Sequence, residues 1–406
     1  MDRRRVLKAA AGALGIVSLR EALAAVGSMA ELGFAELPDG ALEEQILYAL
    51  PGKAPLIKKT FRPPNFETPI EYFRTPYTPN KAFFVRWHLA AIPQLALKDW
   101  TLDIGGESAG RELKLTMDEL RKQFKPAQLT AVCQCSGNRR GLFEPHVAGV
   151  EWGIGAMGNA VWRGVRLKDV LQKAGVKGDA LEIVFDGADH GAIDKTPDFV
   201  KSIPIDVALD DNTLIAFEMN GAPLPHWNGF PARLVVPGWT GTYWVKGLTS
   251  VKVVARPEKN FWMNPAYRLQ RGRFKTPSFK SQLAEANEPI TTMVVNSLIT
   301  SLKSGQQQRR GTPLEVRGIA WDGGSGIAKV EVSTDGTKWT EARLGRDLGR
   351  FSFRQFSLGV PTPEARSLVV MARATSAAGE TQVRELIPNP AGYHHNVIQR
   401  LYVEIV

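Results

Sequence analysis

Cysteine is scarce in this 406-residue sequence, which contains only Cys133 and Cys135. Two thiols exclude a disulfide-stapled scaffold, a four-cysteine zinc finger and an iron–sulfur cluster held by cysteines. The motif C-x-x-C-H is absent, so a covalently attached c-type haem is excluded as well. No internal repeat is visible either.

What the sequence has is an ordinary globular composition with a surplus of positive charge. Hydrophobic residues make up 44% and charged residues 23%, which rules out general disorder and predicts two or three domains. The 51 Lys and Arg residues outnumber the 41 Asp and Glu residues, giving a formal net charge of +10. This balance favours anionic substrates or partners.

The first 25 residues are expected to be an export signal. Arg3 and Arg4, followed by Lys8 and a short apolar run at 9–17, are typical of a twin-arginine signal with cleavage near Ala24. An ordinary basic signal or membrane anchor is the alternative interpretation. The apolar run is too short to span a bilayer, which needs about 20 residues. We therefore expect a soluble periplasmic protein without a membrane span in its mature form.

The rest of the sequence predicts two domains. Residues 26–285 mix strands, loops and short helices without a regular βαβ rhythm, which favours an α+β domain with an N-terminal arm. Strands are expected at 83–88 and 129–135, and helices near 43–50, after Thr116 and at 167–174. Residues 286–406 alternate like β-strands between Gly-rich turns, which predicts an immunoglobulin-like sandwich.

The densest candidate site surrounds the two cysteines, in the stretch from Val132 to Gly141. A strand that ends in a turn would place a thiol at the end of the strand, and Arg139 and Arg140 follow shortly after it in the sequence. Positive charge stabilises the thiolate, which is the form that binds metals or attacks electrophiles. We take Cys135 as the candidate for such chemistry, and Cys133 as a small buried apolar residue.

A second candidate site lies in the strand expected at 83–88. Strand alternation places Arg86 and His88 on one face, where the pair would suit an oxyanion. At 4 Å one such ion pair is worth about 4 kcal/mol at an effective dielectric of 20. The alternative is a surface arginine beside a core histidine.

Further candidates follow in the Gly-rich stretch 228–241 and after it. Asn228, Arg233 and Lys246 lie where backbone N–H groups and positive charge could hold a phosphate, although most Gly-rich turns are only turns. Tyr267 offers a phenol in a loop, and its ordinary role would be to cover the core.

Taken in order, these motifs resemble the sulfite oxidase family of molybdenum enzymes, in particular its bacterial periplasmic sulfite dehydrogenases. The resemblance runs from about residue 45 to the end. It is carried by Phe-Phe-Val-Arg-Trp-His (83–88), Gln-Cys-Ser-Gly-Asn-Arg-Arg (134–140), Glu-Met-Asn-Gly-Ala-Pro-Leu-Pro (218–225), Gly-Phe-Pro-Ala-Arg (229–233) and Val-Pro-Gly-Trp-Thr-Gly (236–241).

The resemblance implies a sulfite-oxidase-type molybdopterin-binding domain, in which a pyranopterin dithiolene and one protein thiolate hold a single molybdenum. It implies that Cys135 is the metal ligand, that Arg86, Arg140, His88, Tyr267 and Trp152 form the substrate pocket, and that Asn228, Arg233 and Lys246 hold the pterin and its phosphate. Asn228 departs from the histidine common in the animal enzymes, and no substrate arginine is recognised near residues 388–392.

The activity implied by the resemblance is oxidation of sulfite to sulfate. The vertebrate members carry a haem domain that this sequence does not resemble, so electrons are expected to pass singly to an external c-type cytochrome. The C-terminal sandwich is similar to the family's dimerisation domain, which implies a homodimer, and no nucleic-acid partner is expected.

Other functions stay open at the level of sequence. A related molybdenum oxidoreductase could act on nitrate or on another oxyanion or sulfur compound. A metal-free periplasmic module could use the same arginines only to bind an anion. A Cys/His hydrolase is also conceivable, but the sequence places no acid beside His88.

Overall fold

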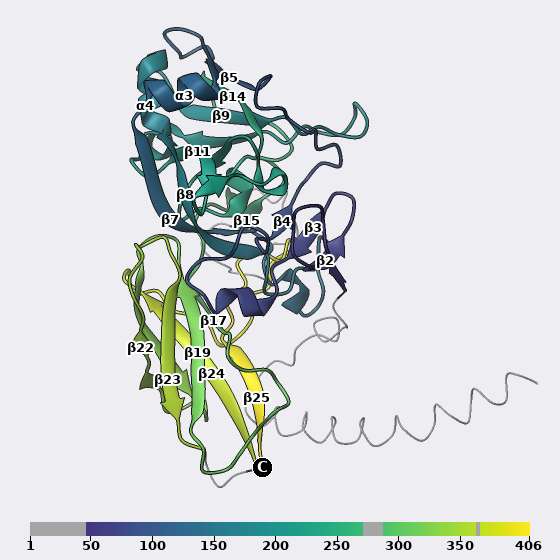
Figure 1. Ribbon diagram of the computed structural model, residues 1–406, viewed down its shortest axis with the longest axis vertical. Coiled ribbons are helices and arrows are strands. Elements are labelled where there is room, and N and C mark those ends of the chain that lie inside the picture. Colours follow the sequence, from purple (N-terminus) through teal and green to yellow (C-terminus); the bar gives the residue numbers. More distant parts are fainter. Residues whose placement is uncertain (1–45, 271–286, 363–365) are drawn as a thin grey trace, which may run out of the picture.

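The described residues form two β-rich regions, and Figure 1 draws one above the other. The computed structural model describes residues 46–270, 287–362 and 366–406. The predicted signal at 1–25 and the predicted boundary at 285/286 lie outside the described residues. Within the described ranges, none of the helices has the length and apolar character needed to cross a membrane.

The described part of the first region contains three sheets. The four-stranded sheet has the order β1-β2-β3-β4, formed by Leu47–Tyr48, Leu56–Thr60, Asn65–Glu67 and Val85–Arg86. The next has the order β10-β9-β14-β5-β6, formed by Lys201–Pro204, Glu182–Gly187, Leu248–Val254, Thr101–Gly105 and Leu113–Thr116. The third has the order β12-β11-β8-β7 with β13 on β11, formed by Ala222–Pro223, Leu214–Met219, Met157–Arg166, Pro126–Gln134 and Arg233–Val235.

The helices of this region are short and start where local signals predict. Helix α3 (Met117–Gln123) opens with a capping box, in which the Glu119 N–H donates to Thr116 Oγ1 at 3.3 Å and the Thr116 N–H donates to the Glu119 carboxylate at 2.9 Å. Helix α4 covers Leu167–Ala174, as the sequence predicts. The remaining helical turns are α5 (Ile205–Ala208), η2 (Ile70–Phe73), η3 (Arg140–Leu142), η4 (His226–Asn228) and η5 (Gly241–Tyr243).

Two local predictions are wrong in part. The helix expected near 43–50 is contradicted over its described residues, because Leu47–Tyr48 form β1 and pair with β2. That pairing is non-local, and it overrides the local helical pattern. The strand expected at 83–88 is limited to Val85–Arg86.

A long antiparallel pair places the predicted thiols. Strand β7 pairs with β8 over nine residues, from Pro126 opposite Val165 to Gln134 opposite Met157. Because β7 ends at Gln134, Cys133 stays in the sheet while Cys135 falls in the turn that follows. The Cys135 N–H donates to the Ala156 carbonyl at 2.8 Å, which fixes the start of this turn.

The C-terminal region is an immunoglobulin-like sandwich, as the sequence predicts. One sheet has the order β17-β19-β23-β22, formed by Asn296–Ile299, Leu314–Trp321, Arg354–Val360 and Arg343–Leu344. The other has the order β18-β25-β24-β20-β21, formed by Gln306–Gln308, Gln399–Ile405, Ser367–Ser376, Ile327–Ser333 and Thr340–Glu341. The short pair β15 (Arg268–Gln270) and β16 (Asn287–Pro289) precedes the sandwich. Together the two regions confirm the predicted α+β architecture with its C-terminal sandwich.

The two regions share a hydrophobic cluster. Val132 and Met157 of the β7–β8 pair pack with Leu298, Ile319 and Trp321 of the sandwich. This contact lies directly beneath the end of β7, so the sandwich supports the segment that carries the two thiols.

Candidate active site

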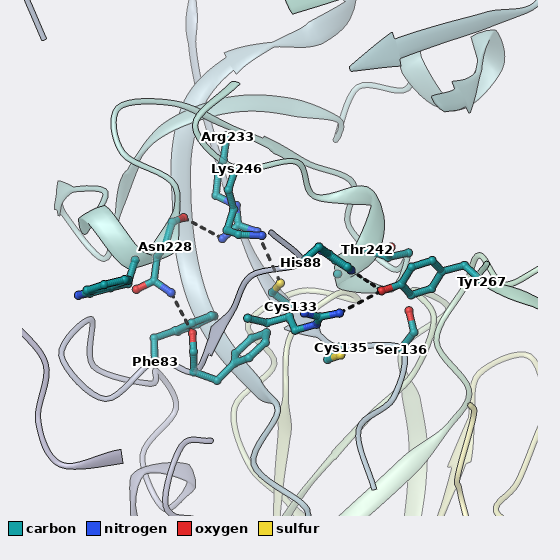
Figure 2. A pocket seen from close by; sticks show the side chains of 14 residues that line it. Phe83, His88, Cys133, Cys135, Ser136, Asn228, Arg233, Thr242, Lys246 and Tyr267 are labelled. Carbon is teal, nitrogen blue, oxygen red and sulfur yellow. Dashed lines mark hydrogen bonds between the residues drawn. The ribbon is translucent and has the colours of Figure 1, made fainter. Parts of the chain in front are cut away.

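A cavity lies where β4 and β7 end and β13 begins, and its wall brings together segments that are far apart in sequence. Figure 2 shows the side chains of this wall. They are Phe83, Phe84, Arg86, His88, Cys133, Cys135, Ser136, Trp227, Asn228, Arg233, Gly241, Thr242, Lys246 and Tyr267.

Both thiols face this cavity, but their surroundings differ. Cys133 lies opposite Gly158 in the sheet and accepts a long contact of 3.9 Å from the Arg233 guanidinium to its Sγ. Burial raises the pKa of the Cys133 thiol, so it stays neutral at pH 7. Cys135 sits in the turn, whose shape is held by the Asn138 N–H donating to the Cys135 carbonyl at 3.0 Å. Since a thiolate is a soft ligand, Cys135 is suited to a redox-active metal.

Arg86, His88 and Tyr267 meet at one side of the cavity. The Arg86 Nη2 donates to the Tyr267 hydroxyl at 3.5 Å, and that hydroxyl also hydrogen-bonds to His88 Nε2 (Figure 2). The His88 ring stacks on Phe199 with centroids 3.7 Å apart. These contacts bring a guanidinium, an imidazole and a phenol to the same point, which suits an oxygen-rich anion.

The charge states of these three groups follow from burial and from each other. Burial raises the pKa of Tyr267, while burial and the charges of Arg86, Lys246 and Lys201 lower the pKa of His88 well below its usual range. Burial alone would lower the pKa of Arg86, but Tyr267 and Cys135 hold it above its usual value. At pH 7 the group is therefore a charged guanidinium beside a neutral phenol and a neutral imidazole.

Asn228, Arg233 and Lys246 line another part of the cavity. Arg233 donates to the Asn228 carbonyl at 3.0 Å and to the Trp244 carbonyl at 3.1 Å, and Lys246 faces it across an isolated β-bridge. The Asn228 amide donates to the Phe84 carbonyl at 3.0 Å and accepts from the Lys53 ammonium. Burial lowers the pKa of Lys246 to about 8.

This wall is rich in cations and poor in compensating charge. Among the described residues, Arg86, Arg233 and Lys246 form no ion pair with a carboxylate. In the same ranges the Nε atoms of both arginines and the Ser136 hydroxyl are buried without a hydrogen-bond partner. Buried cations and polar atoms are costly unless a partner satisfies them. A soft thiol beside unsatisfied donors fits an anionic metal cofactor.

Two predicted pocket residues do not line the cavity. Arg140 donates from Nε to the Ala391 carbonyl at 2.8 Å and from Nη1 to the Val150 carbonyl at 3.2 Å. Its guanidinium lies 5.2 Å from the centre of the Tyr393 ring, which stacks on Tyr267 at 5.6 Å. Trp152 is fully buried, and its carbonyl accepts a hydrogen bond from the Gly141 N–H at 2.9 Å. Arg140 therefore lies next to Tyr393, whose ring stacks on the cavity residue Tyr267.

Sequence reasoning missed two buried lysines next to the site. Lys53 donates to Asn228 and to the Phe83 carbonyl at 3.0 Å. Lys201 donates to the Trp262 carbonyl at 2.6 Å and lies over the rings of Tyr243 and Tyr267. Neither lysine stands in a recognisable motif, because each contacts a segment that is far away in the sequence.

Comparison with known proteins agrees with this geometry. Residues 88–262 match the oxidoreductase molybdopterin binding domain, and residues 287–406 match the Mo-co oxidoreductase dimerisation domain. The mitochondrial sulfite oxidase of Rattus norvegicus is 33% identical over 362 residues, which is 85% of this chain and 65% of the relative. The sulfite oxidase of Gallus gallus is 33% identical and is covered over 72% of its length, with 80% of this chain aligned.

A solved structure extends the likeness over nearly the whole chain. The sulfane dehydrogenase SoxCD from Paracoccus pantotrophus superposes with a TM-score of 0.74 at 26% identity, covering 91% of this chain and 93% of the other. The chain spans 65% of the length of the rat and mouse sulfite oxidases that it matches. The chain therefore belongs to the sulfite oxidase family of molybdenum enzymes, and its cofactor is molybdenum held by molybdopterin.

Proposed function

We propose that this protein is a periplasmic sulfite dehydrogenase. Sulfite and water give sulfate, two protons and two electrons, and the electrons pass one at a time to an external c-type cytochrome. The observation that carries the proposal is the meeting of Arg86, His88 and Tyr267 on the wall of the cavity that Cys135 also lines. The sulfite oxidases among the relatives and the sulfane dehydrogenase structure support a sulfur substrate.

In this proposal some residues of the cavity wall bind the substrate and others bind the cofactor. Arg86 binds a sulfite oxygen and offsets its charge, while the neutral Tyr267 phenol and His88 imidazole orient the anion by hydrogen bonds. Cys135 supplies the protein thiolate to the metal. The molybdenum cofactor, when bound, supplies the two-electron redox chemistry.

The remaining cavity residues are proposed to hold the pterin and its phosphate. Arg233 and Lys246 offer positive charge without a carboxylate partner among the described residues, and Asn228 offers an amide held in place by Lys53 and Phe84. A phosphate in this part of the cavity would satisfy the buried Arg233 Nε.

The deciding experiment is a steady-state assay of molybdenum-loaded protein with an oxidised c-type cytochrome. Reduction of the cytochrome that depends on sulfite supports the proposal. Nitrate with a reduced donor, and a sulfane-sulfur compound with the same cytochrome, are the competing substrates. A higher kcat/KM with either of them, or protein that binds sulfite without turnover at full molybdenum loading, would overturn it.

Export and assembly need their own measurements. The periplasmic location is proposed from the twin-arginine pattern, so replacing Arg3 and Arg4 by lysine is expected to leave the protein in the cytoplasmic fraction. The homodimer is proposed from the match of residues 287–406 to a dimerisation domain. Sedimentation of a monomer at micromolar concentration would contradict it.

A further inference from the structure

The turn that carries Cys135 is hydrogen-bonded to the C-terminal sandwich through one residue before Cys135 and one residue after it. One residue before Cys135, the Gln134 Oε1 accepts a hydrogen bond of 2.7 Å from the indole Nε1 of Trp321, the last residue of β19. Four residues after it, the Arg139 Nη2 donates to the Ser297 carbonyl of β17 at 2.8 Å. Both bonds cross from the first region to the second.

These two bonds form in a dry and closely packed environment. Gln134 is 5% exposed, Arg139 is 2% exposed and Trp321 is 1% exposed. The Arg139 guanidinium also lies 5.9 Å from the centre of a Trp321 ring, so one indole contacts both residues. Buried hydrogen bonds of this kind are expensive to break, because the groups left behind cannot turn to water.

Arg139 has a backbone conformation that is unfavourable for residues other than glycine. Its φ is 69°, in the left-handed region where residues other than glycine are uncommon. Burial lowers the pKa of its guanidinium to about 10, so it is still charged at pH 7. The described residues give it no carboxylate partner, and the carbonyl of Ser297 is the nearest acceptor. The Arg139 N–H donates to the Gly153 carbonyl at 2.7 Å, and the sandwich adds the side-chain contact to this strained residue.

Neither Gln134 nor Arg139 lines the cavity, so neither can act on substrate or cofactor directly. Their side chains point to the sandwich, while Cys135 and Ser136, which lie between them in sequence, line the cavity. The backbone of β7 is tied down in the same direction, since the Val132 N–H donates to the Phe351 carbonyl at 2.9 Å. Residues on both sides of Cys135 are thus hydrogen-bonded to the C-terminal region.

We propose that Gln134, Arg139 and Trp321 form an interdomain clamp that positions the Cys135 thiolate for the metal. In this arrangement the sandwich is part of the cofactor site as well as an assembly module. The three are positioning residues, because they act through Cys135. The inference rests on the proposed role of Cys135 as the metal ligand.

Trp321→Phe tests the clamp because it removes the donor to Gln134 and keeps an aromatic ring in the core. Trp339→Phe is the matched control: it removes an indole N–H of the same domain that has no acceptor among the described residues. Molybdenum-loaded protein of each kind is incubated well below its melting temperature, and the metal that stays with the chain is measured over time.

The clamp predicts that Trp321→Phe loses molybdenum about 2- to 10-fold faster than wild type, the range expected for one buried hydrogen bond. It also predicts a changed paramagnetic resonance signal of the half-reduced metal, which reports the geometry of the thiolate. Trp339→Phe keeps the wild-type loss rate and signal. Equal loss rates and signals in the two variants would overturn the proposal.

A double-mutant cycle guards against a simple loss of stability. Gln134→Met removes the acceptor of the same bond, so its effect on the loss rate should add little to that of Trp321→Phe. Fully additive effects would show that the two residues act separately and would refute the clamp. Sulfite turnover of the wild type is read in parallel, so failure of the proposed substrate is distinguished from failure of the clamp.

Discussion

The two cysteines near the end of β7 are two positions apart, and their surroundings give them different chemical properties. Cys133 is a neutral buried thiol opposite Gly158, whereas Cys135 sits in a turn beside Arg86. We expect Cys135→Ser to abolish sulfite turnover and to lower the molybdenum content, because a serine hydroxyl is a hard donor that stays protonated. Cys133→Ser, the matched control, is expected to retain the metal. Elemental analysis of both variants checks this, and a loaded, active Cys135→Ser protein would contradict the ligand assignment.

Arg86 is the charged group of the Arg86–His88–Tyr267 cluster, so its loss should weaken substrate binding first. For Arg86→Gln we expect a rise in the KM for sulfite of about 10- to 100-fold, the range for losing a hydrogen bond to a charged group. Arg86→Lys keeps the charge without the planar fork and should fall between the two. Steady-state kinetics of the three proteins decide it; an unchanged KM in Arg86→Gln would remove Arg86 from the substrate site.

Lys201 should leave a signature in how stability depends on pH. Burial, and then the charge of Arg268, lowers its pKa to about 7, whereas the pKa of an unfolded lysine is about 10.4. Between these values the unfolded chain binds more protons than the folded chain. The free energy of unfolding should therefore rise with pH, by up to about 1.4 kcal/mol per pH unit from this group.

Urea unfolding of the cofactor-free protein at pH 7.5, 8.5 and 9.5 measures that slope. In Lys201→Met the part of the slope due to Lys201 should disappear, whatever the variant's absolute stability. Lys122→Met, which changes a lysine with a 78% exposed side chain, should keep the wild-type slope. Identical slopes in the wild type and Lys201→Met would show that Lys201 is not deprotonated in this range.

At the scale of elements, the sequence best predicted the helix ends, because local interactions determine them. Helix α3 begins at its capping box, and α4 ends before Gly175, whose φ of 75° suits glycine. Strand β1 was missed because Leu47–Tyr48 owe their conformation to pairing with β2. A local sequence pattern does not show which strand will pair with a segment. Such short strands can therefore be identified only from the folded structure.

The β7–β8 pair contains a glycine on which the cavity wall depends. A Cβ at Gly158 would come within 2.5 Å of the Phe83 ring, and Phe83 lines the cavity. Gly158→Ala should therefore displace Phe83, destabilise the fold by about 1–3 kcal/mol and reduce molybdenum loading. Gly178→Ala is the control, because nothing lies within 4 Å of its added methyl group. Calorimetry and metal analysis check both; normal loading of Gly158→Ala would contradict it.

At the scale of the whole molecule, most of the candidate residues predicted from the sequence lie together in the fold. Cys135, Arg86, His88, Asn228, Arg233, Lys246 and Tyr267 all line one cavity. Arg140 does not, because its guanidinium is taken by the Ala391 and Val150 carbonyls, and Ala391 follows it by 251 residues. Lys53 reaches Asn228 across 175 residues. No motif encodes contacts of that range.

The predicted cleavage near Ala24 removes five basic and two acidic residues, so the formal net charge of +10 falls to +7 in the mature chain. This positive charge makes a prediction about the electron acceptor. Opposite charges speed encounter, and salt screens the attraction over a Debye length of about 10 Å at 0.1 M. With saturating sulfite, kcat/KM for an acidic c-type cytochrome should fall about tenfold or more as ionic strength rises from 0.01 to 0.2 M. A basic cytochrome should react more slowly at low salt, and its kcat/KM should rise as salt screens the repulsion. Equal salt slopes for the two cytochromes would show that the positive charge of the chain does not guide the acceptor.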